Sequence, residues 1–186
     1  MTHQEYIHRY INDHPNPLLL ELPQNESMII STLKPLSTKD YSVIADNVNA
    51  VEVFPSMGVF IPDGKWGATV SFGPCSLAIL TGLETRIWMG HLKPGQSLPD
   101  QVIPSARPYM SQRGPIRLTL MGGCDYGDFD MNAARKIQFD TISRQFSEAH
   151  LDVDLKANWN PYRETWLTAF VQSLSGCADV YVGFER

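Results

Sequence analysis

The sequence lacks the features that mark several classes of protein. It has only three cysteines among 186 residues, Cys75, Cys124 and Cys177, and none of them forms a Cys-x-x-Cys pair. Because their number is odd and their spacing wide, we expect free thiols in a reducing compartment rather than a disulfide framework or a zinc site. The strongly apolar runs have the length of strands, which is too short for a transmembrane helix.

Basic residues are also scarce. The chain has 15 Lys and Arg against 20 Asp and Glu, and its net charge is −5. Nucleic-acid-binding domains usually carry a basic surface, so we expect no nucleic-acid partner. The first residues, MTHQEYIHRYINDHPNP, lack the basic and apolar regions of a secretory signal. We therefore expect a protein without membrane attachment, which is cytoplasmic or is delivered to the cytosol of a target cell.

Apolar and aromatic residues, by contrast, are abundant. Apolar residues make up 43% of the chain, and the aromatic ones comprise 8 Phe, 7 Tyr and 4 Trp. This content excludes intrinsic disorder. A chain of this length can bury roughly 70% of the surface that its unfolded form exposes. It can therefore fold as one compact unit without disulfides or a structural metal.

The local patterns predict an α+β domain that is rich in antiparallel sheet. Short apolar runs bounded by glycine and proline predict strands over residues 27–33, 57–61, 68–72, 75–80, 86–91, 115–121, 151–155, 166–172 and 179–184. Helical spacing predicts a short helix near Tyr6–Ile11 and a long one over Met131–Ala149, with Asp130 as its N-cap. Residues 38–53 favour a helical piece followed by an extended one. The four prolines within 93–114 predict a long surface loop.

One cysteine and one histidine are predicted to face each other. Cys75 and His91 lie equally far along the sequence from Leu83, at the centre of the hairpin predicted over 75–91. Directly opposite residues of antiparallel strands have Cβ atoms about 4.5–5.5 Å apart. An adjacent imidazolium can lower the pKa of a cysteine from ~8.5 into the range of ~3.5–7.5. The thiolate could then attack a carbonyl carbon while the histidine transfers a proton, with Thr69 orienting the ring.

A purely structural interpretation of the same residues stays open. A buried cysteine is usually a small apolar residue, and a histidine that ends a strand usually only makes hydrogen bonds there.

The residues around this pair resemble a known family. The stretch Met57–Gly95, MGVFIPDGKWGATVSFGPCSLAILTGLETRIWMGHLKPG, is similar to the CheD-type chemoreceptor glutamine deamidases. The family's motif positions are occupied here by Thr69, Gly73, Cys75, His91 and Pro94. Downstream, LMGGC (120–124) and MNAARKI (131–137) resemble the family's Gly-Gly strand end and the start of its long helix.

The resemblance implies a fold and an activity. The fold is a single-domain, layered α/β/β sandwich with mostly antiparallel sheets, which the family shares with the catalytic domains of cytotoxic necrotizing factors. Residues 56–186 would form the catalytic domain, and residues 1–55 an N-terminal extension packed on it. The activity is hydrolysis of a glutamine side-chain amide in a protein. Cys75 would be the nucleophile, His91 the general acid and base, and Thr69 the orienting residue. Neither a cofactor nor a metal is needed, the partner is a protein with a surface glutamine, and we expect a monomer.

The chain also departs from the family. Pro74 stands where the family has serine, and it supplies no N–H to an oxyanion. This difference and the N-terminal extension favour a bacterial toxin or effector over a chemotaxis enzyme. A transglutaminase with the same thioester chemistry and an inactive binding module remain alternatives. Leu174-Ser175-Gly176-Cys177 is similar to the nucleophile motif of the necrotizing toxins, but we interpret it as the turn of the last hairpin.

Overall fold

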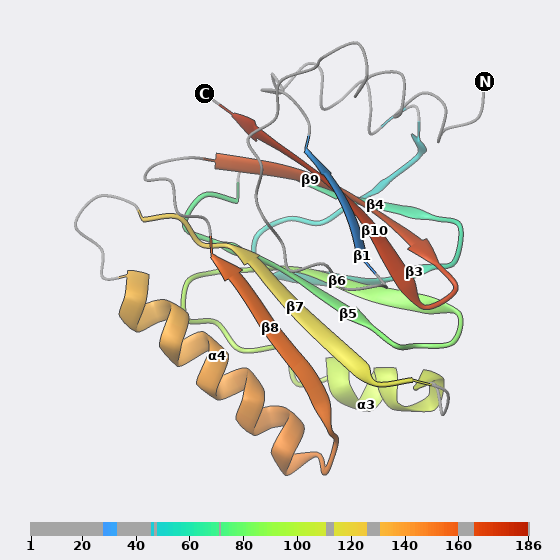
Figure 1. The fold of residues 1–186 in the computed structure, drawn as a ribbon, viewed down its shortest axis with the longest axis vertical. Coiled ribbons are helices and arrows are strands. Elements are labelled where there is room, and N and C mark those ends of the chain that lie inside the picture. Colours follow the sequence, from blue (N-terminus) through green and yellow to red (C-terminus); the bar gives the residue numbers. More distant parts are fainter. Residues whose placement is uncertain are drawn as a thin grey trace.

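The computed structural model describes residues 28–32, 46, 48–70, 72–110, 114–125, 131–159 and 166–185. In these residues the strands form two five-stranded sheets, and the helices lie beside one of them (Figure 1). In chain order, the elements are β1 (Met28–Thr32), β2 (Val51–Glu52), β3 (Met57–Pro62), β4 (Trp66–Thr69), β5 (Ser76–Thr81), β6 (Arg86–Leu92), α3 (Val102–Ala106), the 3-10 helix η1 (Arg107–Tyr109), β7 (Ile116–Gly122), α4 (Met131–Glu148), β8 (Val153–Trp159), β9 (Trp166–Leu174) and β10 (Cys177–Glu185).

Both sheets are mixed. Sheet A has the strand order β1-β10-β9-β4-β2, and sheet B has the order β3-β6-β5-β7-β8. Antiparallel pairs form the middle of each sheet. Among the described strands, parallel pairing always involves an edge strand: β1 beside β10, β2 beside β4, and β8 beside β7. The last pair is parallel because α4 connects its strands, and a parallel pair needs such a crossover. The described chain is therefore α+β with mixed sheets.

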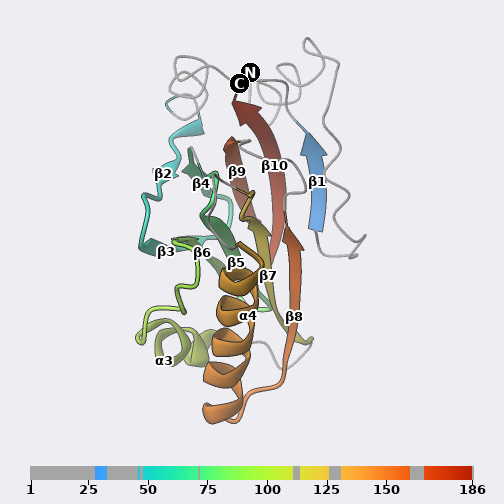
Figure 2. The same cartoon turned by 90° about the vertical axis from the view of Figure 1, so that its left-hand side faces the viewer.

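The layers are held together by two apolar clusters on opposite faces of sheet B. On β6, Ile87 and Met89 point toward sheet A, whereas Trp88 and Leu92 point toward the helices. Sheet B is thus covered on both faces, which explains why nearly all of β6 is buried. The turned view shows the resulting order: sheet A, sheet B, helices (Figure 2).

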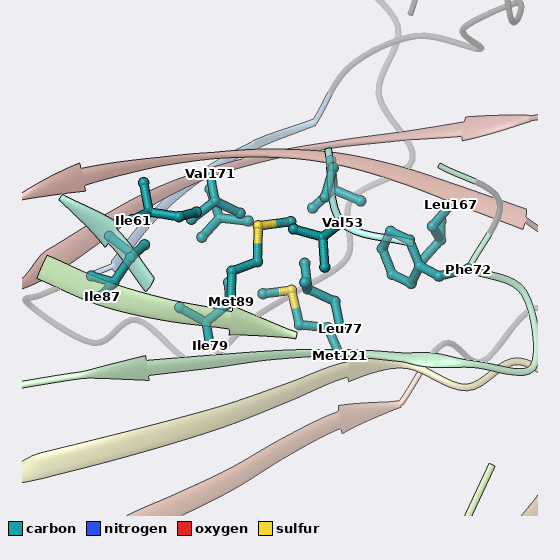
Figure 3. Packing of buried hydrophobic residues seen from close by; sticks show 14 residues of the cluster. Val53, Ile61, Phe72, Leu77, Ile79, Ile87, Met89, Met121, Leu167 and Val171 are labelled. Atoms are coloured by element: carbon teal, nitrogen blue, oxygen red, sulfur yellow. The ribbon is translucent and has the colours of Figure 1, made fainter. Parts of the chain in front are cut away.

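An apolar cluster lies between the sheets (Figure 3). Its buried members are Val53, Ile61, Phe72, Leu77, Ile79, Ile87, Met89, Met121, Leu167, Ala169, Val171, Ala178, Val180 and Val182. The partly buried Cys75 packs against it. The candidate nucleophile therefore lies at the margin of the inter-sheet core.

Most predicted elements are confirmed, with boundaries that shift by a few residues. The structure contains the strands expected over 27–33, 57–61, 75–80, 86–91, 115–121, 151–155, 166–172 and 179–184, and the helix expected from Met131. The expected helix near Tyr6–Ile11 and the N-cap Asp130 lie outside the described residues. Within 38–53, Val48 is helical and Val51–Glu52 is extended, as expected. In the part of the chain that the structure describes, no helix is both long and apolar enough to span a membrane.

The prediction of a surface loop over residues 93–114 was wrong. This region contains α3 and η1, and Leu98, Val102 and Ala106 are buried in the cluster beneath the helices. The prolines do not prevent the helices, because proline is tolerated in a first helical turn, as Pro108 is at the start of η1. The apolar side chains between the prolines form the face that packs against sheet B.

The strand predicted over residues 68–72 was also misplaced. It is β4, which begins at Trp66 and ends at Thr69. Phe72 lies beyond the strand, and its N–H donates to the Leu167 carbonyl at 3.0 Å. Thr69 is therefore the last residue of the strand.

Two glycines with similar backbones test how closely the turns are packed. Gly176 (φ +78°) lies in the β9–β10 turn, and a Cβ there would stand 1.9 Å from the Leu83 carbonyl oxygen. Gly64 (φ +76°) has nothing within 4 Å of such a Cβ. We expect Gly64→Ala to lower the free energy of unfolding in urea by about 1–2 kcal/mol, because of the left-handed backbone alone. Gly176→Ala should lower the free energy of unfolding by about 2 kcal/mol more, because the Leu83 backbone must move to admit the methyl group. Equal losses would contradict this packing.

Candidate active site

The pairing predicted between Cys75 and His91 was wrong by two residues. His91 lies opposite Leu77, and the β5–β6 ladder is centred on Glu84 instead of Leu83. Leu83 forms a separate bridge with Met110, which draws it out of the expected turn centre. Cys75 comes directly before β5 and packs against the cluster between the sheets, so it lies on the same side as His91, whose ring reaches Thr69 of sheet A. If β5 is continued by one residue, Cys75 is a diagonal neighbour of His91, a position whose usual separation is about 7–8 Å.

Thr69 and His91 form a hydrogen bond between the two sheets. Thr69 ends β4 in sheet A and His91 lies in β6 of sheet B, and Oγ1 is 2.8 Å from Nδ1. The Thr69 hydroxyl donates its own hydrogen to the Val53 carbonyl at 2.7 Å. It must therefore accept from His91, which places the ring proton on Nδ1 and leaves the lone pair on Nε2. Both side chains are buried, with 1% of their surface exposed.

The free ring nitrogen is unusual. In the described structure Nε2 of His91 is buried and has no hydrogen-bond partner. The Phe72 ring and the imidazole pack edge to face, with centroids 6.2 Å apart. Buried polar atoms are nearly always bonded, so each exception calls for an explanation. A base that is to receive a proton from a neighbouring group provides one.

The expectation of a resting thiolate–imidazolium pair is not met. Burial lowers the pKa of His91 from 6.5 to about 4, although the nearby Val53 carbonyl opposes this shift. Burial also raises the pKa of the half-buried Cys75 thiol; Lys93 lowers it in part, and Cys124 raises it further. Both groups are therefore neutral at pH 7, a thiol beside an imidazole.

A loop after β7 supports the backbone of Cys75. The Gly123 N–H donates to the Cys75 carbonyl at 2.8 Å, and the Cys124 N–H donates to the Gly73 carbonyl at 2.9 Å. Gly122 has φ +92°, and a Cβ there would stand 2.7 Å from the Phe72 ring and 3.1 Å from the Cys75 carbonyl oxygen. The Gly-Gly pair thus permits close packing of two loops.

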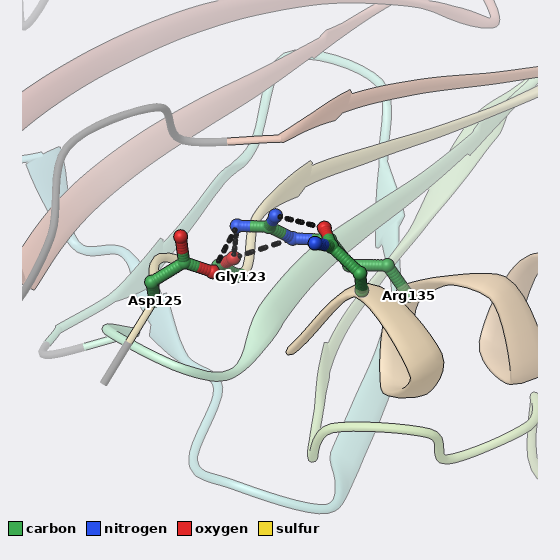
Figure 4. Close-up of polar contacts among 4 residues, drawn as sticks. Gly123, Asp125 and Arg135 are labelled. Carbon is green, nitrogen blue, oxygen red and sulfur yellow. Dashed lines mark hydrogen bonds and ion pairs between the residues drawn. The ribbon is translucent and has the colours of Figure 1, made fainter. Parts of the chain in front are cut away.

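Arg135 of α4 fastens this loop to the helix (Figure 4). Its Nε donates to the Gly123 carbonyl at 2.9 Å, and Nη2 donates to the same oxygen. Nη2 also lies 3.3 Å from the Asp125 carboxylate. The sequence singled out the segment containing Arg135 only as a family motif, and nothing in its spacing indicated this contact.

The other cysteines lie elsewhere. Cys124 is buried and Cys177 is half-buried, and none of the three cysteines is in a disulfide. Cys177 pairs with Leu174 across the β9–β10 turn, as we interpreted this segment. A cavity of about 640 Å³ lies beside this turn, at the end of β5 opposite to Cys75. Within the described ranges, no group of three His, Cys, Asp or Glu residues could hold a metal.

The sequence matches no protein-family model and no curated protein.

The buried neutral imidazole predicts a specific pH dependence of stability. The folded protein disfavours protonation of His91, whose pKa falls from 6.5 to about 4. Its stability should therefore be complete above pH 6.5 and should fall by about 3 kcal/mol as the pH drops toward 4. Urea unfolding across this range measures the loss.

His91→Gln is the matched control, because every other titrating group is shared. The difference in unfolding free energy between the two proteins should change across this window. A constant difference would show that His91 does not titrate as described.

Proposed function

We propose that this chain is a cysteine-dependent protein-glutamine deamidase. It would hydrolyse the side-chain amide of a surface glutamine in a protein partner and leave glutamate and ammonia. The observation that carries the proposal is the Thr69–His91 hydrogen bond between the sheets. That bond leaves Nε2 as a proton acceptor on the side of sheet B against which Cys75 also packs.

The geometry supports a mechanism that begins from the neutral pair. The Cys75 thiol transfers its proton to Nε2 of His91 as its sulfur attacks the amide carbon. The imidazolium then protonates the amide nitrogen, which leaves as ammonia, and a thioester remains on Cys75. Water attacks the thioester while it gives a proton to Nε2, and His91 returns this proton to the sulfur as glutamate leaves. Catalytic contacts are often long in the free enzyme and shorten with substrate, which suits the diagonal placement of this pair.

Thr69 and Val53 stabilise the charged ring while it carries two protons. The ring donates through Nδ1 to Thr69, which in turn donates to the Val53 carbonyl. A chain of this kind holds the ring orientation and the tautomer, as the third member of a catalytic triad does.

The oxyanion needs a donor near Cys75. Pro74 has no N–H, and the N–H groups of Gly123 and Cys124 already donate to backbone carbonyls. We therefore assign the oxyanion to the N–H of Cys75 itself.

The layer order and the site together support membership of the CheD and necrotizing-factor superfamily. Within it, we favour a toxin or effector that acts on a cytosolic protein. Pro74 departs from the family motif, and β1 and β2, from the N-terminal region without a counterpart in that family, belong to sheet A. A chemoreceptor deamidase is the alternative within the same chemistry.

Conversion of glutamine to glutamate in candidate target proteins tests the proposal. Mass spectrometry should detect conversion with the wild-type protein and none with Cys75→Ser. His91→Ala should lower the rate about 10²–10⁴-fold, because the general acid–base is lost. Cys177→Ser is the control and should retain the rate, since Cys177 lies at the far end of the sheets.

The remaining alternatives give different results in the same assay. A transglutaminase would incorporate a labelled amine in preference to releasing ammonia. An inactive binding module would leave the glutamines of every protein unchanged, with the wild type and Cys75→Ser indistinguishable.

A further inference from the structure

A buried glutamine of α4 contacts both arms of the candidate site. Gln138 exposes 2% of its surface. Its Oε1 accepts from the Ser76 hydroxyl at 2.8 Å, and its Nε2 donates to the carbonyls of Lys93 at 3.2 Å and Gln96 at 2.8 Å. Ser76 follows the nucleophile directly, and Lys93 comes two residues after His91. One amide group therefore connects the start of β5 with the turn that follows β6.

Several hydrogen bonds hold that turn. Lys93-Pro94-Gly95-Gln96 has the proline and glycine placed as in a type II turn, with φ +73° at Gly95. The Gln96 N–H donates to the Lys93 carbonyl at 3.0 Å. The Gln96 side chain accepts from the Lys93 N–H at 2.9 Å and from the Ser56 hydroxyl at 3.3 Å. The backbone of Lys93 thus has a defined position relative to α4.

Lys93 is the cation that acts on the nucleophile. Its charge lowers the pKa of Cys75 against the effect of burial. Cys124, which follows β7, acts in the opposite direction, and the neutral His91 lies on β6. Lys93 therefore acts on the thiol from the turn after β6, which Gln138 connects to the start of β5.

A second glutamine of α4 provides a comparison. Gln145 lies seven residues further along the helix, on the same face. Its Oε1 accepts from the Leu98 N–H at 3.1 Å, and its Nε2 donates to the Leu98 carbonyl at 2.8 Å. Gln145 therefore binds the same segment between β6 and α3 to the same helix, but it does so at Leu98, which is further along the chain from Cys75 and Lys93.

We propose that Gln138 is a positioning residue that holds the start of β5 and the Lys93 turn in register and thereby sets the reactivity of the Cys75 thiol. Its purpose in catalysis rests on the proposed function, whereas its effect on the thiol can be measured without any substrate. The amide suits this task because it accepts from one arm and donates twice to the other, which neither a carboxylate nor an apolar side chain can do.

Alkylation of Cys75 by iodoacetamide, located by peptide mass spectrometry, tests the proposal. Gln138→Leu should slow alkylation at neutral pH about tenfold, since small displacements of reacting groups are costly. It should also raise the pH midpoint of the reaction, because the backbone of Lys93 loses its hydrogen bond to α4 and the cation shifts relative to Cys75. Gln145→Leu should stay within about twofold of wild type at a similar loss of stability, because each variant removes hydrogen bonds to partly buried backbone groups.

Ser76→Ala gives a milder variant that removes only one contact of Gln138. If Gln138 acts partly through Ser76, the double variant should slow the alkylation of Cys75 by less than the product of the two factors found for the single variants. Two results would overturn the proposal. In the first, Gln138→Leu and Gln145→Leu have equal alkylation rates and equal pH midpoints. In the second, the effects of Ser76→Ala and Gln138→Leu on the alkylation rate are independent and the pH midpoint of Gln138→Leu is unchanged. Slower alkylation in Gln138→Leu with no deamidation by the wild type would refute the proposed function and leave the role of Gln138 intact.

Discussion

The site depends on a polar contact between two sheets whose facing surfaces are mainly apolar. Facing sheets lie about 10 Å apart, a distance that two interdigitating layers of side chains fill. Thr69 from one sheet and His91 from the other meet across this space at 2.8 Å. The direction of this bond is fixed because the Thr69 hydroxyl has a single hydrogen, which it donates to the Val53 carbonyl. One backbone carbonyl thus decides the tautomer of the histidine, and through it which ring nitrogen can act as a base.

Burial gives this contact its chemical character. The same desolvation that makes the Thr69–His91 bond strong also disfavours the charged imidazole and the thiolate. The resting site is therefore uncharged and would acquire separated charge only as a thiol proton moves. The bonds of the ring to Thr69 and of Thr69 to Val53 are then already in place, so the ring does not need to reorient when it becomes charged. Lys93 supplies a positive charge from the exposed side.

Helix α4 serves both stability and the site, in different parts of its length. Toward its C-terminal end, Ile142 and Phe146 are fully buried and belong to the cluster on the outer face of sheet B. Nearer its N-terminal end, Arg135 and Gln138 reach the loops around Cys75. The buried apolar side chains anchor the helix, which gives Arg135 and Gln138 a fixed position from which they hold the loops.

The identity of the elements was largely determined by the sequence, since alternation and helical spacing are local properties. The sequence also singled out Thr69, Cys75 and His91, of which the structure joins Thr69 and His91 by a hydrogen bond and places Cys75 on the same face. The strand register was not predictable in this way, because the bridge between Leu83 and Met110 depends on a segment that looked like a loop. Only the tertiary structure decided the protonation states and the contact of Gln138 with Ser76, 62 residues away. Desolvation and hydrogen bonds between distant segments arise when the layers assemble, and no local pattern of residues encodes them.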